Sequence, residues 1–205
     1  MILYIKTCYN QKVKTVNTRT TNYDIDDVFL KRYSPRAMSG EVTTKEELMS
    51  LVEAARWAPS SNNNQPWRFI YALNSSPDFE KFLSFLAEGN RVWCKKASAL
   101  IVVVSKETFD KGNPSTTHSL DAGASWENFA LQATKIGLIA HGMQGFDYTL
   151  AKEKLSVPDG YVVEMMIALG KPGKIEDLPE YLQEREKPSQ RKNLEEIVFE
   201  GKFKK

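Results

Sequence analysis

Apolar residues at helical spacing predict a helix over residues 44–58. Thr44 and Glu47 have the spacing of a capping box at its start, and Pro59 follows its end. The apolar stripe consists of Leu48, Leu51, Val52 and Ala55. Such a stripe packs against a core, so the helix is expected to deliver the residues after Pro59 to a defined place.

Two shorter helices are predicted from the same spacing. One ends before Pro35, with Ile25, Val28 and Phe29 on one face. The other begins with Ser76 as its cap and Pro77 as its first residue. Its inner face is predicted to carry Phe79, Phe82, Leu83 and Leu86.

A long helix is predicted over residues 119–136, and Gly137 marks its end. It is rich in small residues, namely Ala122, Gly123, Ala124, Ala130 and Ala133. Small side chains allow close approach of a second helix. Composition alone does not distinguish a helix at a dimer interface from one buried inside a single chain.

Four stretches have the composition of strands: residues 67–73, 99–104, 138–141 and 161–170. Residues 99–104 are apolar without interruption, which predicts a central strand buried on both faces. Asn90 and Trp93 are predicted to lie in a polar turn before it, and Asp147 is predicted to cap a further helix. Residues 106–117 are predicted to form a loop, too short for additional lid helices.

Composition and charge narrow the functional classes. A chain of 205 residues with 41% hydrophobic and 26% charged residues can bury one substantial core. Its net charge of +2 demands neither nucleic acid nor an anionic membrane, and no apolar run approaches membrane-spanning length. Cys8 and Cys94 provide neither a disulfide framework nor a metal site, so we expect a reducing, cytoplasmic location. His118 and His141 lie beside no plausible nucleophile or orienting acid, so both are interpreted as structural.

The first 23 residues differ from the rest because they contain no Asp or Glu. A basic segment without acidic residues is also typical of a transit peptide, but this one lacks the expected abundance of Arg and Ser. We therefore expect residues 1–23 to form an N-terminal arm that is mobile or lies over a partner subunit, and residues 24–205 to form one domain.

Residues 57–69 carry the most unusual chemistry in the chain. Pro59 ends a helix, and Pro66 is expected to impose an extended path into the next strand. The six residues between them, Ser60 to Gln65, are all small and polar. Carboxamide side chains offer a donor and an acceptor on one flat group, which suits the edge of an isoalloxazine ring. A plain polar loop with Asx turns is the alternative.

A second polar cluster lies upstream, where Arg32, Ser34 and Arg36 surround the helix break at Pro35. Two guanidinium groups and a hydroxyl make a suitable cradle for a phosphate. Cations in a last helical turn are also favoured without any ligand, because they interact with the helix dipole. A phosphate cradle together with a ring-binding loop suggests FMN.

The order of these motifs resembles the nitroreductase family of FMN-dependent oxidoreductases. The chain has Arg-x-Ser-x-Arg, then a helix, then Ala-Pro-Ser-Ser, a run of amides and Gln-Pro-Trp-x-Phe. Further stretches are similar to the family's central helix, flavin-side loop, last core strand and C-terminal arm, at residues 121–128, 142–147, 167–172 and 191–197. The resemblance runs from about Asp24 to Phe203.

The resemblance implies a fold, an assembly and a set of contacts. The fold would be α+β, a mixed and mainly antiparallel sheet flanked by helices, in a homodimer that exchanges a C-terminal arm over residues 173–205. The FMN-binding residues would be Arg32, Tyr33, Ser34, Arg36, Pro59, Ser60, Ser61, Asn62, Asn63, Gln65, Asn90, Met143, Gln144, Gly145 and Arg191. Ser189 stands where a Lys is common in the family, and Gln144 where some members carry an acid.

The implied activity is two-electron transfer from NAD(P)H to a nitroaromatic, a quinone or a similar small planar acceptor, in a ping-pong cycle. No side chain is then an obligatory acid or base and no metal is needed, because the flavin supplies the electron chemistry. Two alternatives stay open. One is specialised flavin chemistry in the same family, such as dehalogenation or flavin fragmentation; the other is a non-catalytic flavin-binding module.

Overall fold

The structure of the chain is a computed structural model that describes residues 15, 16 and 18–204. The predicted N-terminal arm falls largely on residues 1–14 and 17, which lie outside the described residues, so it stays a prediction. The chain divides into two compact units. Ser34–Glu186 forms the main unit, and Met1–Tyr33 with Lys187–Lys205 forms the terminal unit. Within the described part of the chain, no helix is long and apolar enough to cross a membrane.

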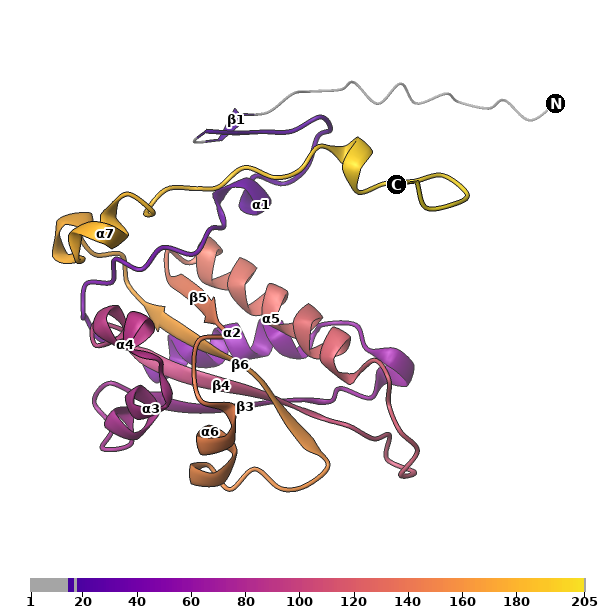
Figure 1. The fold of residues 1–205 in the computed structure, drawn as a ribbon, viewed down its shortest axis with the longest axis horizontal. Helices are drawn as coiled ribbons and strands as arrows, with labels where there is room; N and C mark the ends of the chain where they lie inside the picture. Colours follow the sequence, from indigo (N-terminus) through magenta and orange to yellow (C-terminus); the bar gives the residue numbers. More distant parts are fainter. Residues whose placement is uncertain (1–14, 17, 205) are drawn as a thin grey trace. The chain divides into compact units, whose positions relative to one another are not determined.

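A four-stranded sheet is the centre of the main unit (Figure 1). Its strands are β3 (Trp67–Leu73), β4 (Ala99–Lys106), β5 (Ile139–Met143) and β6 (Tyr161–Gly170), in the order β3-β4-β6-β5. Each neighbouring pair is antiparallel, and the register places Phe69 opposite Val103 and Val102 opposite Met166. The sheet and its flanking helices confirm the predicted α+β class.

Helices cover both faces of this sheet. On one face, α2 (Lys45–Arg56) contacts α5 (His118–Lys135), and both pack on the side of β4 that carries Ile101 and Val103. On the other face, the side chains of Leu100 and Val102 join a cluster to which α3 (Phe79–Phe85), α4 (Glu88–Cys94) and α6 (Tyr148–Lys154) contribute. Strand residues alternate between faces and both faces of β4 are covered, so residues 99–104 are apolar and buried without interruption, as predicted.

Several predicted helix boundaries are confirmed. Thr44 and Glu47 form both bonds of the capping box, at 3.1 Å from Glu47 N–H to Thr44 Oγ1 and 2.7 Å from Thr44 N–H to Glu47 Oε2. Asp147 caps α6 by accepting the Leu150 N–H at 2.9 Å. Gly137, after α5, has a φ of 78°, in the left-handed region where glycine is favoured.

Other local predictions were wrong. Asn90 and Trp93 lie in α4 rather than in a polar turn, and the Trp93 side chain is buried. The helix predicted from Ser76 begins only at Phe79, after a turn. Strand β5 extends two residues beyond the predicted end, to Met143, because pairing with β6 continues through Gly142 and Met143. In each case pairing or packing with a distant element outweighed the local signal.

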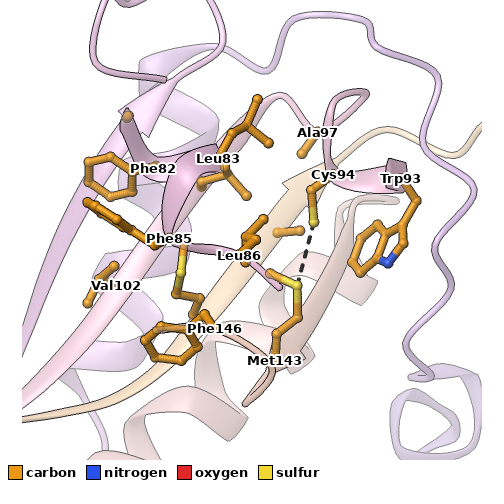
Figure 2. Packing of buried hydrophobic residues seen from close by; sticks show 14 of the residues in the cluster. Phe82, Leu83, Phe85, Leu86, Trp93, Cys94, Ala97, Val102, Met143 and Phe146 are labelled. Atoms are coloured by element: carbon orange, nitrogen blue, oxygen red, sulfur yellow. Dashed lines mark hydrogen bonds between the residues drawn. The ribbon is translucent and has the colours of Figure 1, made fainter. Parts of the chain in front are cut away.

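Cys94 and Met143 lie in the cluster to which α3 and α4 contribute, and their sulfur atoms are joined by the dashed line in Figure 2. The Cys94 thiol donates to the Met143 thioether across 3.5 Å, and both side chains are buried. Burial raises the pKa of the Cys94 thiol, so it stays protonated and acts as a packing group. Phe82, Phe85, Leu86 and Phe146 surround this part of the core.

The terminal unit contains the hairpin β1 (Thr15–Val16) and β2 (Arg19–Thr20), the short helix α1 (Asp27–Lys31) and a C-terminal segment with η3 (Leu194–Glu196). Asp26 caps α1 by accepting the Val28 N–H at 2.8 Å. The helix buries Val28 and Leu30, whereas Ile25 and Phe29 are 39% and 50% exposed. The helix ends before Pro35 as predicted, but it begins at Asp27, so Ile25 lies outside it.

Candidate functional site

The loop between α2 and β3, residues 58–66, is the first part of the candidate site. It contains Ser60, Ser61 and the η1 turn (Ser61–Asn63), and we call it the carboxamide loop. The side chains of Asn62, Asn63 and Gln65 are exposed, as is Pro59, while Trp67 at the start of β3 is buried. Helix and strand thus fix both ends of the loop and leave its amide groups open to a ligand.

The backbone of the carboxamide loop is unusual at three of the predicted site residues. Asn62, Asn63 and Gln65 have φ values of 50°, 54° and 47°, in the left-handed region. Non-glycine residues there are strained, and such strain persists only where surrounding contacts enforce it. The extended path predicted before Pro66 therefore begins only after Gln65.

Hydrogen bonds hold this strained conformation. The Asp121 carboxylate, in the first turn of α5, accepts the Ser61 N–H at 3.2 Å and is buried. The Ser60 hydroxyl accepts the Gln65 N–H at 3.0 Å, and the Gln65 side-chain amide donates to the Asn63 carbonyl at 3.0 Å. Asp121 is a residue that the sequence reasoning did not single out, because it lies 60 residues from its partner.

The turn between β5 and α6 is the second part of the site. Asn90 Nδ2 donates to the Gly145 carbonyl at 3.0 Å, and the Ala87 N–H donates to the same oxygen at 3.0 Å. A Cβ on Gly145 would lie 2.8 Å from Asn90 Nδ2, so a larger residue there would displace the Asn90 amide from this bond. Asn90 and Gly145, predicted as separate ligands, are thus in direct contact.

Met143 and Gln144 differ in what they can present at this turn. The Met143 side chain points into the core (Figure 2), so only its main chain is available to a ligand. Gln144 is exposed. As a carboxamide it can donate and accept hydrogen bonds, but it cannot act as a carboxylic acid would.

Ser34 and Arg36 lie at the beginning of the main unit, on a segment that is held from two sides. The buried Glu186 carboxylate accepts the Arg36 N–H at 2.8 Å and the Ala37 N–H at 3.2 Å, and it lies 3.4 Å from Arg36 Nη1. His141 Nδ1 is 3.1 Å from the Pro35 carbonyl. Arg36 therefore has a carboxylate partner, and its role toward a phosphate stays a prediction.

Arg32, Tyr33 and Arg191 belong to the terminal unit, where a third arginine joins Arg32 and Arg191. The guanidinium of Arg19 donates to the Arg32 carbonyl at 2.6 Å and to the Ser189 carbonyl at 3.0 Å. Burial lowers the pKa of Arg19, and the nearby charges of Arg191 and Arg32 lower it further. Sequence reasoning missed Arg19, since its contact with Ser189 spans 170 residues.

His118 was interpreted as structural, with no plausible nucleophile or orienting acid beside it, but a hydroxyl and a carboxylate do lie near its ring. Its Nδ1 is 2.7 Å from Ser105 Oγ and 3.5 Å from Glu164 Oε1. Ser105 is completely buried, however, and its hydroxyl donates to the Glu164 carboxylate. A hydroxyl that is inaccessible and already bound to the acid cannot serve as a nucleophile, so the group is structural.

Metal ligation finds no support among the described residues, where no group of three or more His, Cys, Asp or Glu side chains could hold an ion. The carboxamide loop and the turn between β5 and α6 present amide side chains, hydroxyls and backbone N–H groups. Such groups bind and orient a polar planar ligand rather than perform acid–base chemistry on their own.

Comparison with known proteins gives these features a context. A sequence model of the nitroreductase family matches residues 29–92. A solved structure described as an oxidoreductase containing FMN is 45% identical to the chain, with a TM-score of 0.90, and the match covers 93% of this chain and 98% of that one. The chain belongs to the nitroreductase family.

The chain is also similar to two further proteins. A nitroreductase family protein of Clostridium difficile is 25% identical, with a TM-score of 0.66 over 86% of this chain and 98% of that one. An uncharacterised 15.4 kDa protein of Mycolicibacterium smegmatis is 34% identical over 126 residues, which are 61% of this chain and 84% of that one. The predicted family is confirmed, and membership places the chain among oxidoreductases.

Proposed function

We propose that this nitroreductase-family protein binds FMN and transfers two electrons from NAD(P)H to a nitroaromatic, a quinone or a similar small planar acceptor. The carboxamide loop supports this proposal most directly, because three exposed amides are held there in strained backbone conformations. A relative that is 45% identical is described as containing FMN. A cytoplasmic location is part of the same proposal.

Arginines suit the phosphate of FMN, and carboxamides suit the edge of its ring. In the terminal unit, repulsion among Arg19, Arg32 and Arg191 is relieved when an anion binds, which suits a phosphate. In the main unit, the amides of Asn62, Asn63 and Gln65 match the alternating donors and acceptors of a flavin's pyrimidine edge. We assign the remaining predicted FMN-binding residues to the same cofactor, with Met143 acting through its main chain.

Bound FMN would supply the electron chemistry, accepting a hydride from NAD(P)H and passing two electrons to the acceptor in alternation. The chain's own residues then have binding and orienting tasks. Asp121 and Ser60 hold the amide-bearing backbone in place, and Asn90 fixes the turn at Gly145. Preorganised N–H donors stabilise negative charge on a reduced ring because they need no rearrangement during the reaction.

The activity is tested by mixing the purified protein with FMN and NADPH without oxygen. We expect the visible flavin absorbance to bleach and then to return on addition of a nitroaromatic or a quinone. Protein that stays yellow with NADPH and NADH would instead support a flavin-binding module. Bleaching without reoxidation by these acceptors would favour specialised flavin chemistry.

The phosphate assignment is tested by Arg32→Ala and Arg191→Ala. Each should weaken FMN binding by about 1.5 to 3 kcal/mol, because each removes a charge-assisted hydrogen bond. Affinity is measured by quenching of flavin fluorescence. Arg185→Ala is the control, since Arg185 is also exposed near the C-terminus but is not assigned to the site. Unchanged affinity in both site variants would refute the assignment.

A further inference from the structure

Arg19 is the most deeply buried cation among the described residues of the terminal unit, and it has no place in any motif of the sequence. Only 5% of the residue is exposed. Its Nη1 donates to the carbonyls of Leu30 at 3.0 Å and Arg32 at 2.6 Å, and its Nε donates to the carbonyl of Ser189 at 3.0 Å. A buried guanidinium needs such acceptors, because burial without them is costly.

These bonds join three segments of the terminal unit. Arg19 lies on β2, Leu30 and Arg32 lie at the C-terminal end of α1, and Ser189 lies two residues before Arg191. The Gln190 side chain adds a bond to the Thr18 carbonyl at 2.6 Å, next to Arg19. The two arginines that we assign to the phosphate are therefore both connected to Arg19 through the main chain.

The contact with Ser189 brings two guanidinium groups to one oxygen. Arg191 Nη1 lies 3.4 Å from the Ser189 carbonyl that also accepts from Arg19 Nε, and 3.1 Å from the Ser189 hydroxyl. The charges of Arg191 and Arg32 also act on Arg19. Arg19 and Arg191 both line a cavity of about 680 Å³ inside the terminal unit, so space for an anion lies beside them.

We propose that Arg19 is a positioning residue of the phosphate site: by binding the carbonyls of Arg32 and Ser189, it presents Arg32 and Arg191 to the same phosphate. This role rests on the proposed binding of FMN. The planar fork of arginine is essential to it, because one group must donate in three fixed directions. Lysine would keep the charge but would not reproduce this geometry.

The test compares FMN with riboflavin, which has the same ring but no phosphate. Both are titrated into wild type, Arg19→Gln, Arg19→Lys and the control Arg185→Gln, which removes the same charge from an exposed side chain. We expect Arg19→Gln to weaken FMN about tenfold to a hundredfold and to leave riboflavin binding unchanged. Arg19→Lys should lose the preference for FMN as well, and Arg185→Gln should keep it.

Three results would overturn the proposal. If Arg19→Gln bound FMN as tightly as wild type does, Arg19 would not be needed for phosphate binding. An equal loss of affinity for FMN and for riboflavin would show a general structural role. The same conclusion would follow if Arg19→Gln failed to fold while Arg19→Lys kept the full preference for FMN. A wild type that binds both flavins equally would instead contradict the proposed function itself. In a protein that already carries both Arg32→Ala and Arg191→Ala, Arg19→Gln should weaken FMN little further, because neither arginine is then left to position.

Discussion

Single residues with long-range partners hold the candidate site in place. Asp121 binds the carboxamide loop, and Glu186 and His141 bind the segment that begins at Ser34. The sequence indicated the residue types at the site itself, because clustered amides and arginines are visible locally. It did not indicate the supporting residues, since a lone carboxylate or imidazole has no local pattern that reveals its partner.

The pKa of His141 leads to a prediction on stability. Burial lowers it, and so does the charge of Arg36, although the Pro35 carbonyl and Glu186 act in the opposite direction. As the pH falls below about 6.5, His141 therefore becomes protonated in the unfolded chain before it does in the folded protein. The free energy of unfolding should decrease through that window, and the imidazole contributes its full stabilisation only above it.

Urea denaturation of wild type and His141→Gln at about pH 7.5 and about pH 5.5 checks this expectation. The variant loses the contact with Pro35 and the ring contact with Trp93, whose centroid lies 4.8 Å away, so it should be less stable at the higher pH. The difference between the two proteins should shrink at the lower pH. A constant difference would mean that His141 does not titrate as described.

The elements of the fold were predicted best where the periodic signal was long. The helix over residues 44–58 and the strand over residues 99–104 are confirmed as α2 and β4, apart from their ends. Helix α4 was missed, because its seven residues include Gly89 and Asn90 and have little helical propensity of their own. It forms because Trp93 and Cys94 are buried in the core.

Two helix ends allow a matched test of element stability. After α5 and after α6 the chain makes the same pair of bonds: Leu138 N–H to Ala133 O and Gly137 N–H to Thr134 O, and Val157 N–H to Lys152 O and Ser156 N–H to Glu153 O. In both turns a left-handed residue follows the helix, and its N–H and the next N–H donate to carbonyls of the last helical turn. This arrangement is a Schellman motif. Gly137 occupies that position in the first, with a φ of 78°, and Ser156 in the second, with a φ of 53°.

We therefore expect Ser156→Gly to stabilise the protein by roughly 0.5 to 1 kcal/mol, because glycine adopts this conformation without steric strain. Gly137→Ser should destabilise it by a similar amount for the opposite reason. Thermal or urea unfolding of the two variants and wild type gives both values. A destabilising Ser156→Gly would show that the lost side chain matters more than the backbone strain.

At the scale of the whole molecule, the predicted homodimer is a property of assembly. The predicted homodimer places the small-residue helix α5 at its interface. Gly123 lies on α5, and a Cβ added there would have no heavy atom within 4 Å. The chain itself therefore has room for a larger side chain at this position. An arginine there should leave the protomer folded but block close packing of a second copy.

Light scattering on Gly123→Arg tests this prediction directly. Wild type should have twice the 23.3 kDa mass of one chain, and the variant should approach the mass of a single chain. Gly89→Arg is the control, because Gly89 on α4 also has open space around it. A dimeric Gly123→Arg protein would place the interface elsewhere, and a monomeric wild type would refute the homodimer.

The sequence by itself determined the family, the α+β class and the two chemical signatures, arginines near Pro35 and carboxamides before Pro66. Such features depend on residue type and spacing over a few turns of chain. Only the tertiary structure decided which groups hold them: Arg19 through Arg32 and Ser189, Asp121 through Ser61, and Glu186 through Arg36. These contacts form only when packing brings residues that are far apart in the sequence together, and no local pattern indicates which distant residues will meet.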